Sequence, residues 1–132
     1  MPYEITYLNE EGGLITTYWG TITDSDIIKS GQEKLTSLER LRSYRYALTD
    51  LSRVEKSELT SKGIQANVDI ASIIMKENIN FIVAFVLPTD VEYGMGRMWQ
   101  AYGDRYKIKS YVCRTRVEAE TWIKEKLKRQ IL

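Results

Sequence analysis

The chain has 132 residues, 43% of them hydrophobic and 28% charged, and a formal net charge of +1. The length and hydrophobic share predict one domain over residues 1–132 with a core of its own, and the small charge gives no strong field to attract nucleic acid or an anionic membrane surface. The sequence has no histidine and a single cysteine, Cys113, which removes the commonest general base, the commonest zinc ligand and any internal disulfide.

The sequence carries no sign of export or membrane insertion. Residues 1–13 lack the basic segment and apolar core of a signal peptide, and the longest apolar run, residues 81–88, is far too short to span a bilayer. With the lone cysteine, these features favour a cytoplasmic location. The scattered acids make a metal site a poor prediction, and no cofactor-binding motif is recognised.

The first third of the chain is predicted to contain a β-hairpin and a helix. Residues 3–8 and 14–19 are rich in aromatic and β-branched residues, and the polar and glycine residues between them are typical of a turn. Thr23 or Asp24 can cap the helix that follows. Its apolar residues recur at helical spacing and predict one continuous helix of about five turns. They are Ile27, Ile28, Gly31, Leu35, Leu38 and Leu41.

Strands and helices alternate after this first helix. Residues 46–51 are predicted to form a third strand, which a charged loop connects to a helix over residues 58–77. The stretch 81–87 is apolar throughout, which is typical of a strand that is covered on both faces. Pro88 ends it.

The last part of the chain continues the alternation. A helix over residues 90–104, capped by Thr89 or Asp90, precedes a strand over residues 108–113. Thr115 then begins the last helix, with Glu118 at the spacing of a capping box. The order ββαβαβαβα predicts an α/β fold with a mixed, mostly parallel five-stranded sheet packed with four helices.

The loop after residues 46–51 is the first candidate site, because partners and ligands of open α/β sheets meet the carboxyl ends of strands. Asp50 is either a functional acid or, as is commoner for aspartate, a carboxylate that hydrogen-bonds backbone amides or caps a helix. The candidate partner residues are Asp50, Ser52, Arg53, Glu58, Thr60 and Ser61.

The helix over residues 90–104 is the second candidate site. Its two interior glycines allow either close packing of helix on sheet or a ligand against the backbone. Its methionine and aromatic residues are predicted to share one broad face, which is core, a subunit interface or the lining of a lipid-sized pocket. Arg97 points elsewhere, toward an acid or an anion. The candidate ligand or interface residues are Tyr93, Gly94, Met95, Arg97, Met98, Trp99 and Tyr102.

Three segments resemble the SpoIIAA-like group of the STAS (sulfate transporter and anti-sigma factor antagonist) fold, and together they extend the resemblance over nearly the full chain. TDLSRVEKSELT, residues 49–60, looks like the antagonists' Asp-Leu-Ser-x-Val strand and loop. VAFVLPTDVEYGMGRMW, residues 83–99, is similar to the group's strand, proline, helix and Gly-x-x-Arg pattern. YVCRTRVEAETWI, residues 111–123, looks like its last strand and Glu-Ala-x-x-Trp helix.

The resemblance implies a STAS-like α/β sandwich. In true antagonists, a partner kinase phosphorylates a serine that opens the second helix. Alignment on Asp50-Leu51-Ser52 places Leu59 at that serine position and Glu58 at the preceding aspartate, so this switch is predicted to be absent. The neighbouring hydroxyls are better explained as helix caps than as phosphate acceptors. They belong to Ser57, Thr60 and Ser61.

Two functions are compatible with these features. The favoured one is a non-enzymatic STAS-like regulatory or protein-interaction module that also self-associates, with a homodimer expected. The alternative is a carrier or sensor of a small apolar or anionic ligand such as a lipid. In that alternative the helix segment 94–99 and the sheet wall a pocket, and Arg97 binds an acidic head group. No credible catalytic set is recognised, so an enzyme is not predicted.

Overall fold

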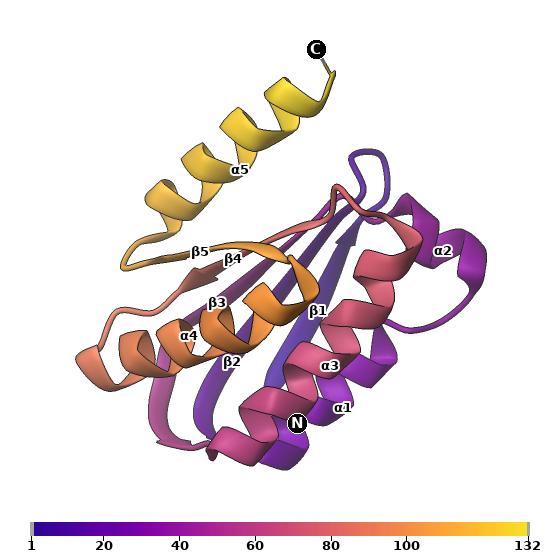
Figure 1. Cartoon of the computed structure of the whole chain (residues 1–132). Coiled ribbons are helices and arrows are strands. Elements are labelled where there is room, and N and C mark those ends of the chain that lie inside the picture. Colours follow the sequence, from indigo (N-terminus) through magenta and orange to yellow (C-terminus); the bar gives the residue numbers. More distant parts are fainter. Residues whose placement is uncertain (1, 132) are drawn as a thin grey trace.

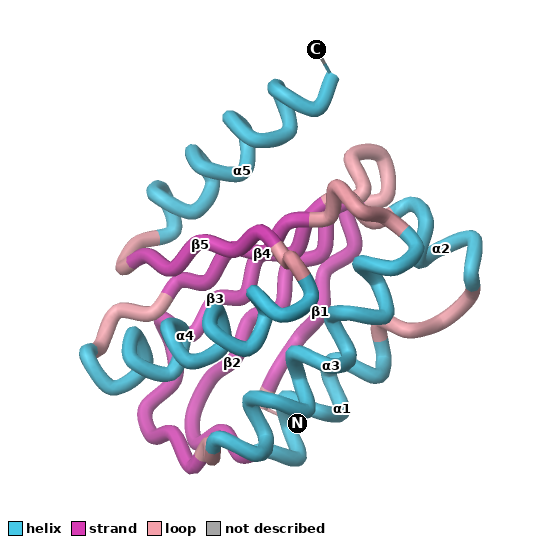
Figure 2. The backbone as a smooth tube through the Cα atoms, in the orientation of Figure 1, coloured by secondary structure: helices cyan, strands magenta, loops and turns pink. Residues whose placement is uncertain are grey.

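The computed structural model describes residues 2–131, and the side chains up to residue 128. Within these residues the chain forms a five-stranded sheet and five α-helices, with one short 3-10 helix, η1 (Figures 1 and 2). In chain order the elements are β1 (Tyr3–Leu8), β2 (Gly13–Thr23), α1 (Asp24–Glu33), α2 (Leu38–Ser43), β3 (Tyr46–Glu58), α3 (Ser61–Glu77), β4 (Ile82–Val86), α4 (Asp90–Gly103), η1 (Asp104–Tyr106), β5 (Lys109–Cys113) and α5 (Arg116–Ile131).

The strands lie side by side in the order in which they occur along the chain, β1-β2-β3-β4-β5. β1 and β2 form the predicted antiparallel hairpin, and the other neighbouring pairs are parallel. Each parallel connection crosses over through helix. Because such crossovers have one hand, α1, α3 and α4 cover the same face of the sheet, as Figure 1 shows. The predicted mixed, mostly parallel sheet is confirmed.

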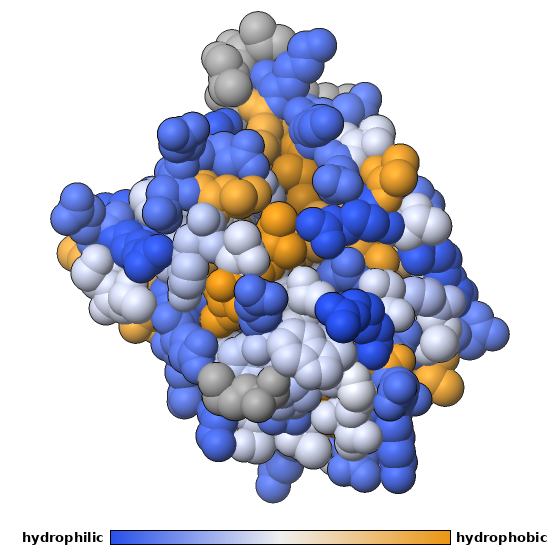
Figure 3. Space-filling model, turned by 180° about the vertical axis from the view of Figure 1, so that it is seen from behind, coloured by the Kyte–Doolittle hydropathy of each residue, from blue (hydrophilic) through white to orange (hydrophobic). Residues whose placement is uncertain are grey.

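The sheet has a hydrophobic core on each face. Side chains alternate along β3, so that Ala47 and Leu51 face α1, α3 and α4, while Tyr46 and Leu48 face the opposite side. On that opposite side α5 packs against β3, β4 and β5. Seen from behind, hydrophobic residues are visible in the middle of the molecule between hydrophilic ones (Figure 3). β4 is buried along its whole length, as its apolar sequence predicts.

The predicted five-turn helix is wrong. α1 ends at Glu33, residues 34–37 are not helical, and α2 begins at Leu38, which gives five helices where four are predicted. Two local contacts explain the break. The Tyr44 hydroxyl donates to the carbonyl of Lys34 at the end of α1, and the Ser37 side chain accepts the Arg40 N–H and so caps a new helix.

The predicted loop after residue 51 is also wrong, because β3 continues to Glu58 and α3 begins only at Ser61. β2 is longer than predicted as well, and it pairs with β3 as far as Thr23 and Glu58, with register irregularities on the way. This ladder supplies backbone hydrogen bonds to a polar segment that carries no strand pattern of its own.

Threonine residues begin four of the helices, and the one before α3, Thr60, is described with the candidate site below. Thr23 and Thr89 occupy the N-cap positions of α1 and α4. The caps are therefore these threonines and not the aspartates that follow them, Asp24 and Asp90. Glu118 donates its backbone N–H to the Thr115 hydroxyl at the start of α5, as the capping-box spacing predicts.

Candidate functional site

Residues 52–61, the β3–α3 junction, form an exposed ribbon and helix start at one end of the sheet. β4 ends at Val86, opposite Asp50, so within the described chain β3 pairs only with β2 beyond that point. One edge of the polar end of β3 therefore has no strand neighbour, and free strand edges are natural places for another chain to dock. The exposed residues of the junction are Ser52, Arg53, Glu55, Lys56, Glu58, Thr60 and Ser61.

Asp50 lies inside β3 and holds the sheet to α5. It is 6% exposed, its Oδ2 lies 3.0 Å from Nη1 of Arg116, and its Oδ1 accepts the Ser52 N–H at 2.8 Å. Both carboxylate oxygens are thus engaged by a charge and a backbone donor. Of the two roles considered for Asp50, the contacts fit a carboxylate that hydrogen-bonds backbone amides.

Thr60 connects the start of α3 to the start of α1. Its backbone N–H donates to Oδ1 of Asp24 at 2.8 Å, and its hydroxyl donates to the other oxygen of the same carboxylate. The hydroxyl oxygen also accepts the Gly63 N–H, as an N-cap does. A phosphate on Thr60 would lie against the Asp24 carboxylate, so like-charge repulsion opposes phosphorylation there.

Replacing Thr60 with alanine should lower the free energy of unfolding by about 1–2 kcal/mol, because the cap and the bond to Asp24 are both lost. Urea unfolding measures the change. Thr60→Ser keeps the hydroxyl and should stay close to wild type. An equal loss in both variants would mean that the methyl group, and not the hydroxyl, is what matters at this position.

Three of the four methionine and aromatic residues of α4 that were predicted to share one face do so, and Met98 does not. Trp99 is 5% exposed, packs on Phe85 with ring centroids 4.8 Å apart, and donates its indole N–H to Asn67. Met95 and Tyr102 also pack against this core, whereas Met98 is 37% exposed. The face that Met95, Trp99 and Tyr102 share is therefore core, the first of the three alternatives given for it.

Tyr93 and the two glycines of α4 have separate roles. The Arg114 guanidinium lies 4.3 Å from the centroid of the Tyr93 ring, in a cation–π contact. Gly96 packs directly on Leu87 and Val112, whereas a Cβ at Gly94 would meet no described atom within 4 Å. Close packing therefore explains Gly96 and leaves Gly94 without a structural requirement.

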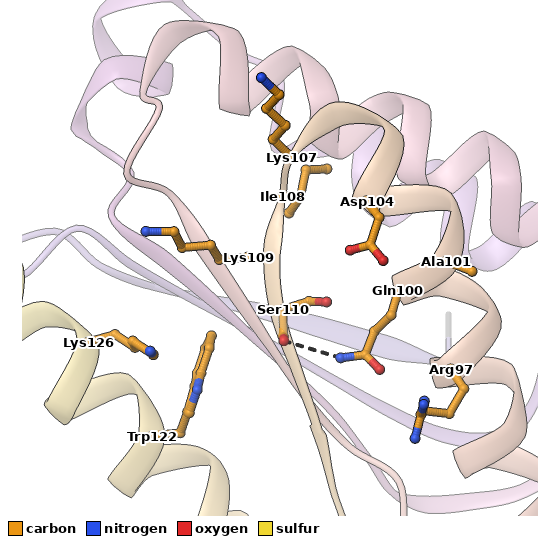
Figure 4. A pocket seen from close by; sticks show the side chains of 10 residues that line it. All are labelled: Arg97, Gln100, Ala101, Asp104, Lys107, Ile108, Lys109, Ser110, Trp122 and Lys126. Atoms are coloured by element: carbon orange, nitrogen blue, oxygen red, sulfur yellow. Dashed lines mark hydrogen bonds between the residues drawn. The ribbon is translucent and has the colours of Figure 1, made fainter.

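Arg97 points away from the core, as predicted, into a surface hollow of about 680 Å³ that we call the β5 groove (Figure 4). The groove lies over β5 between α4 and α5. The sequence reasoning singles out only Arg97 among its lining residues. The others are Gln100, Ala101, Asp104, Lys107, Ile108, Lys109, Ser110, Trp122 and Lys126.

A central cavity of about 70 Å³ lies between the sheet and the helices and contains an unexpected polar group. Lys34, just after α1, extends its side chain into this cavity and into a second one of about 40 Å³ beneath α3. No described side chain forms an ion pair with Lys34, and burial lowers its pKa to about 8. On β2, the buried Thr16 hydroxyl also has no described hydrogen-bond partner.

Cys113 is buried at the end of β5. Burial raises its pKa to about 11, so the thiol stays protonated near neutral pH. Among residues 2–128, no group of three or more His, Cys, Asp and Glu side chains is placed to hold a metal ion. No helix of the described chain is both long and apolar enough to cross a membrane.

This architecture matches solved structures of the SpoIIAA-like fold. The anti-sigma factor antagonist SpoIIAA in its unphosphorylated form aligns with a TM-score of 0.58 at 10% sequence identity, covering 92% of this chain and 97% of that one. An uncharacterized DUF3478-family protein with a SpoIIAA-like fold, from Shewanella loihica, aligns with a TM-score of 0.54 at 14% identity, covering 92% and 91%.

No protein-family model and no curated protein sequence matches the chain. The identities to the two solved structures are low, so the likeness concerns the fold. The chain has an α/β fold of the SpoIIAA-like, STAS type, and the predicted resemblance is confirmed at that level.

Proposed function

We propose that this protein is a non-enzymatic regulatory module that works by binding a protein partner, and that the β3–α3 junction is the surface it presents. The observation that carries the proposal is the combination of the SpoIIAA-like fold with an exposed, charged strand end that has a free edge. One solved neighbour of the fold is an anti-sigma factor antagonist, a regulatory protein.

Regulation by phosphoserine at the family position is not part of the proposal. Leu59, which the sequence alignment places there, has no hydroxyl, and its side chain packs against the core and lines the central cavity. The Thr60 hydroxyl is already bonded to Asp24 and Gly63. Both observations support a partner interface that is not switched by phosphate at these two positions.

The carrier hypothesis is less well supported. The central cavity, at about 70 Å³, has room for a few water molecules, whereas small-molecule sites typically enclose about 300–1,000 Å³. Arg97, which that hypothesis uses to bind a head group, lies outside this cavity, in the β5 groove. The groove volume of about 680 Å³ is within that range, but its lining is mostly charged and polar and does not suit an apolar ligand. Self-association as a homodimer and a cytoplasmic location stay predictions.

Affinity capture from cells that express the protein tests the proposed interface. The double variant Arg53→Glu, Lys56→Glu reverses two exposed charges of the junction and should reduce recovery of a specific partner roughly tenfold. Each reversed charge then faces partner groups of the same sign, and like charges weaken an interface strongly. Lys76→Glu, Lys128→Glu makes the same net change at exposed positions away from the junction and should leave recovery unchanged. Equal recovery with both variants would contradict the proposed surface.

A further inference from the structure

The β5 groove carries an excess of positive charge. Four cationic side chains line it, and Asp104 is its one carboxylate. The ion pairs among the described side chains involve none of these four cations. The chain as a whole carries a formal charge of only +1, so the groove is a local excess and not part of a general basic surface. The four are Arg97, Lys107, Lys109 and Lys126.

An aromatic surface accompanies these charges. Trp122 of α5 faces the groove and stacks on Tyr111 of β5, with ring centroids 5.3 Å apart and planes 13° apart. The ammonium of Lys126, one turn further along α5, lies 6.0 Å from the centroid of the Trp122 ring. A rigid tryptophan beside basic residues is typical of the anchor positions of protein interfaces.

The arrangement of the cations favours an extended ligand over a single compact anion. Figure 4 shows the four cations at different sides of the groove and not converging on one point. Arg97 comes from α4, Lys107 from the turn before β5, Lys109 from β5 and Lys126 from α5. The adjacent end of α4 is its C-terminus, which lacks the free N–H groups that usually bind phosphate. Distributed carboxylates fit this surface better than phosphate does.

The edge of β5 is partly closed to strand addition. The Gln100 side chain donates to the carbonyl of Ser110 at 3.2 Å, as the dashed line in Figure 4 marks. That carbonyl faces away from β4, since the Cys113 carbonyl, three residues further along, accepts a bond from Leu87 on the β4 side. A ligand in the groove is therefore held by side chains more than by a backbone ladder.

We propose that the β5 groove is a second binding surface of this protein, and that its occupant is an extended, glutamate- or aspartate-rich segment of a partner protein. The carboxylates pair with the four cations around the groove, and an apolar side chain of the segment packs on Trp122. This inference does not depend on the junction, because the groove and residues 52–61 share no residue.

Fluorescence anisotropy with fluorescein-labelled decaglutamate tests the proposal. Wild-type protein should bind the peptide at low ionic strength, and the peptide should dissociate as salt is added. Lys109→Glu, Lys126→Glu should weaken binding roughly tenfold or more, because like charges then face the peptide. Lys29→Glu, Lys62→Glu, two exposed lysines of α1 and α3, makes the same net change and should have little effect.

Three results would overturn the proposal: no binding by the wild type at low salt, equal weakening in both double variants, or displacement of the peptide by tripolyphosphate at a lower concentration than by unlabelled decaglutamate. The last would mean a phosphate site. Trp122→Ala should weaken binding of a peptide that alternates glutamate with leucine more than binding of decaglutamate, since only the former has side chains to pack on the ring. The partner capture described above is independent of all these outcomes.

Discussion

Gly96→Val should lower the free energy of unfolding by about 3 kcal/mol, the upper part of the range for overpacking a core. A Cβ at this position would lie 2.2 Å from Cδ1 of Leu87 and 3.1 Å from Cγ1 of Val112. The Leu87 side chain lines the central cavity and can turn aside, but Val112 is buried and both its Cγ atoms lie within 3.2 Å of that Cβ, so α4 would have to shift away from the sheet. Urea unfolding of wild type and variant measures the loss.

Gly94→Ala, two residues earlier in the same helix, is the matched control. The added methyl group meets no described atom within 4 Å, and alanine is favoured over glycine in a helix by about 1 kcal/mol. This variant should therefore be more stable than wild type. A loss of stability at Gly94, or none at Gly96, would show that α4 does not lie on the sheet as described.

Lys34→Met should make the protein more stable near neutral pH. The lowering of the Lys34 pKa from 10.5 to about 8, converted at about 1.4 kcal/mol per unit, gives a gain of about 3.5 kcal/mol. Between these two pKa values the unfolded chain binds more protons than the folded one, so the stability of the wild type gains from this group as pH rises from about 8 to 10.5. Methionine fills the same space without a charge.

The stability difference between wild type and Lys34→Met, measured by urea unfolding, should therefore be largest below pH 8 and vanish near pH 10.5. Tyrosines such as Tyr3 have raised pKa values, which lower stability at high pH, but they act equally in both proteins and cancel in the difference. Lys29→Met, at an exposed position of α1, should give a small difference that does not change with pH. A stability difference between wild type and Lys34→Met that does not change with pH would mean that the Lys34 ammonium of the wild type lies in solvent.

Elements whose signals are local could be predicted from the sequence. Strand alternation in residues 3–8, the uniformly apolar stretch 81–87 and the capping pattern of Thr115 with Glu118 all appear in the structure as expected. Each depends on neighbouring residues alone. The STAS-like fold followed from these elements together with segment resemblance.

Features that depend on distant contacts could not be predicted. The apolar spacing runs unbroken through Leu35 and Leu38, and only the bond from Tyr44 to Lys34 and the cap at Ser37 reveal that the helix divides. The polar residues at the end of β3 become a strand only because β2 pairs with them. Tertiary pairing prevails over weak local preference in both places.

The candidate site divides in the same way. Thr60 and Asp50 were recognised from their chemistry, but their actual partners, Asp24 and Arg116, come from distant parts of the chain. The β5 groove is assembled from α4, β5 and α5, and Arg97 is its only lining residue that the sequence analysis names as a candidate. Lys34 gave no signal, because a lysine at a helix end is ordinarily on the surface.

Site-specific photo-crosslinking in cells tests the proposed interaction surface most directly. A benzophenone side chain at the exposed Glu55 lies within the β3–α3 junction, and one at the exposed Glu39 of α2 serves as the control. The proposal predicts a specific crosslink to a partner protein from position 55 and none from position 39. Partner crosslinks from position 39 alone, or from both positions equally, would contradict the junction as the surface through which this protein acts.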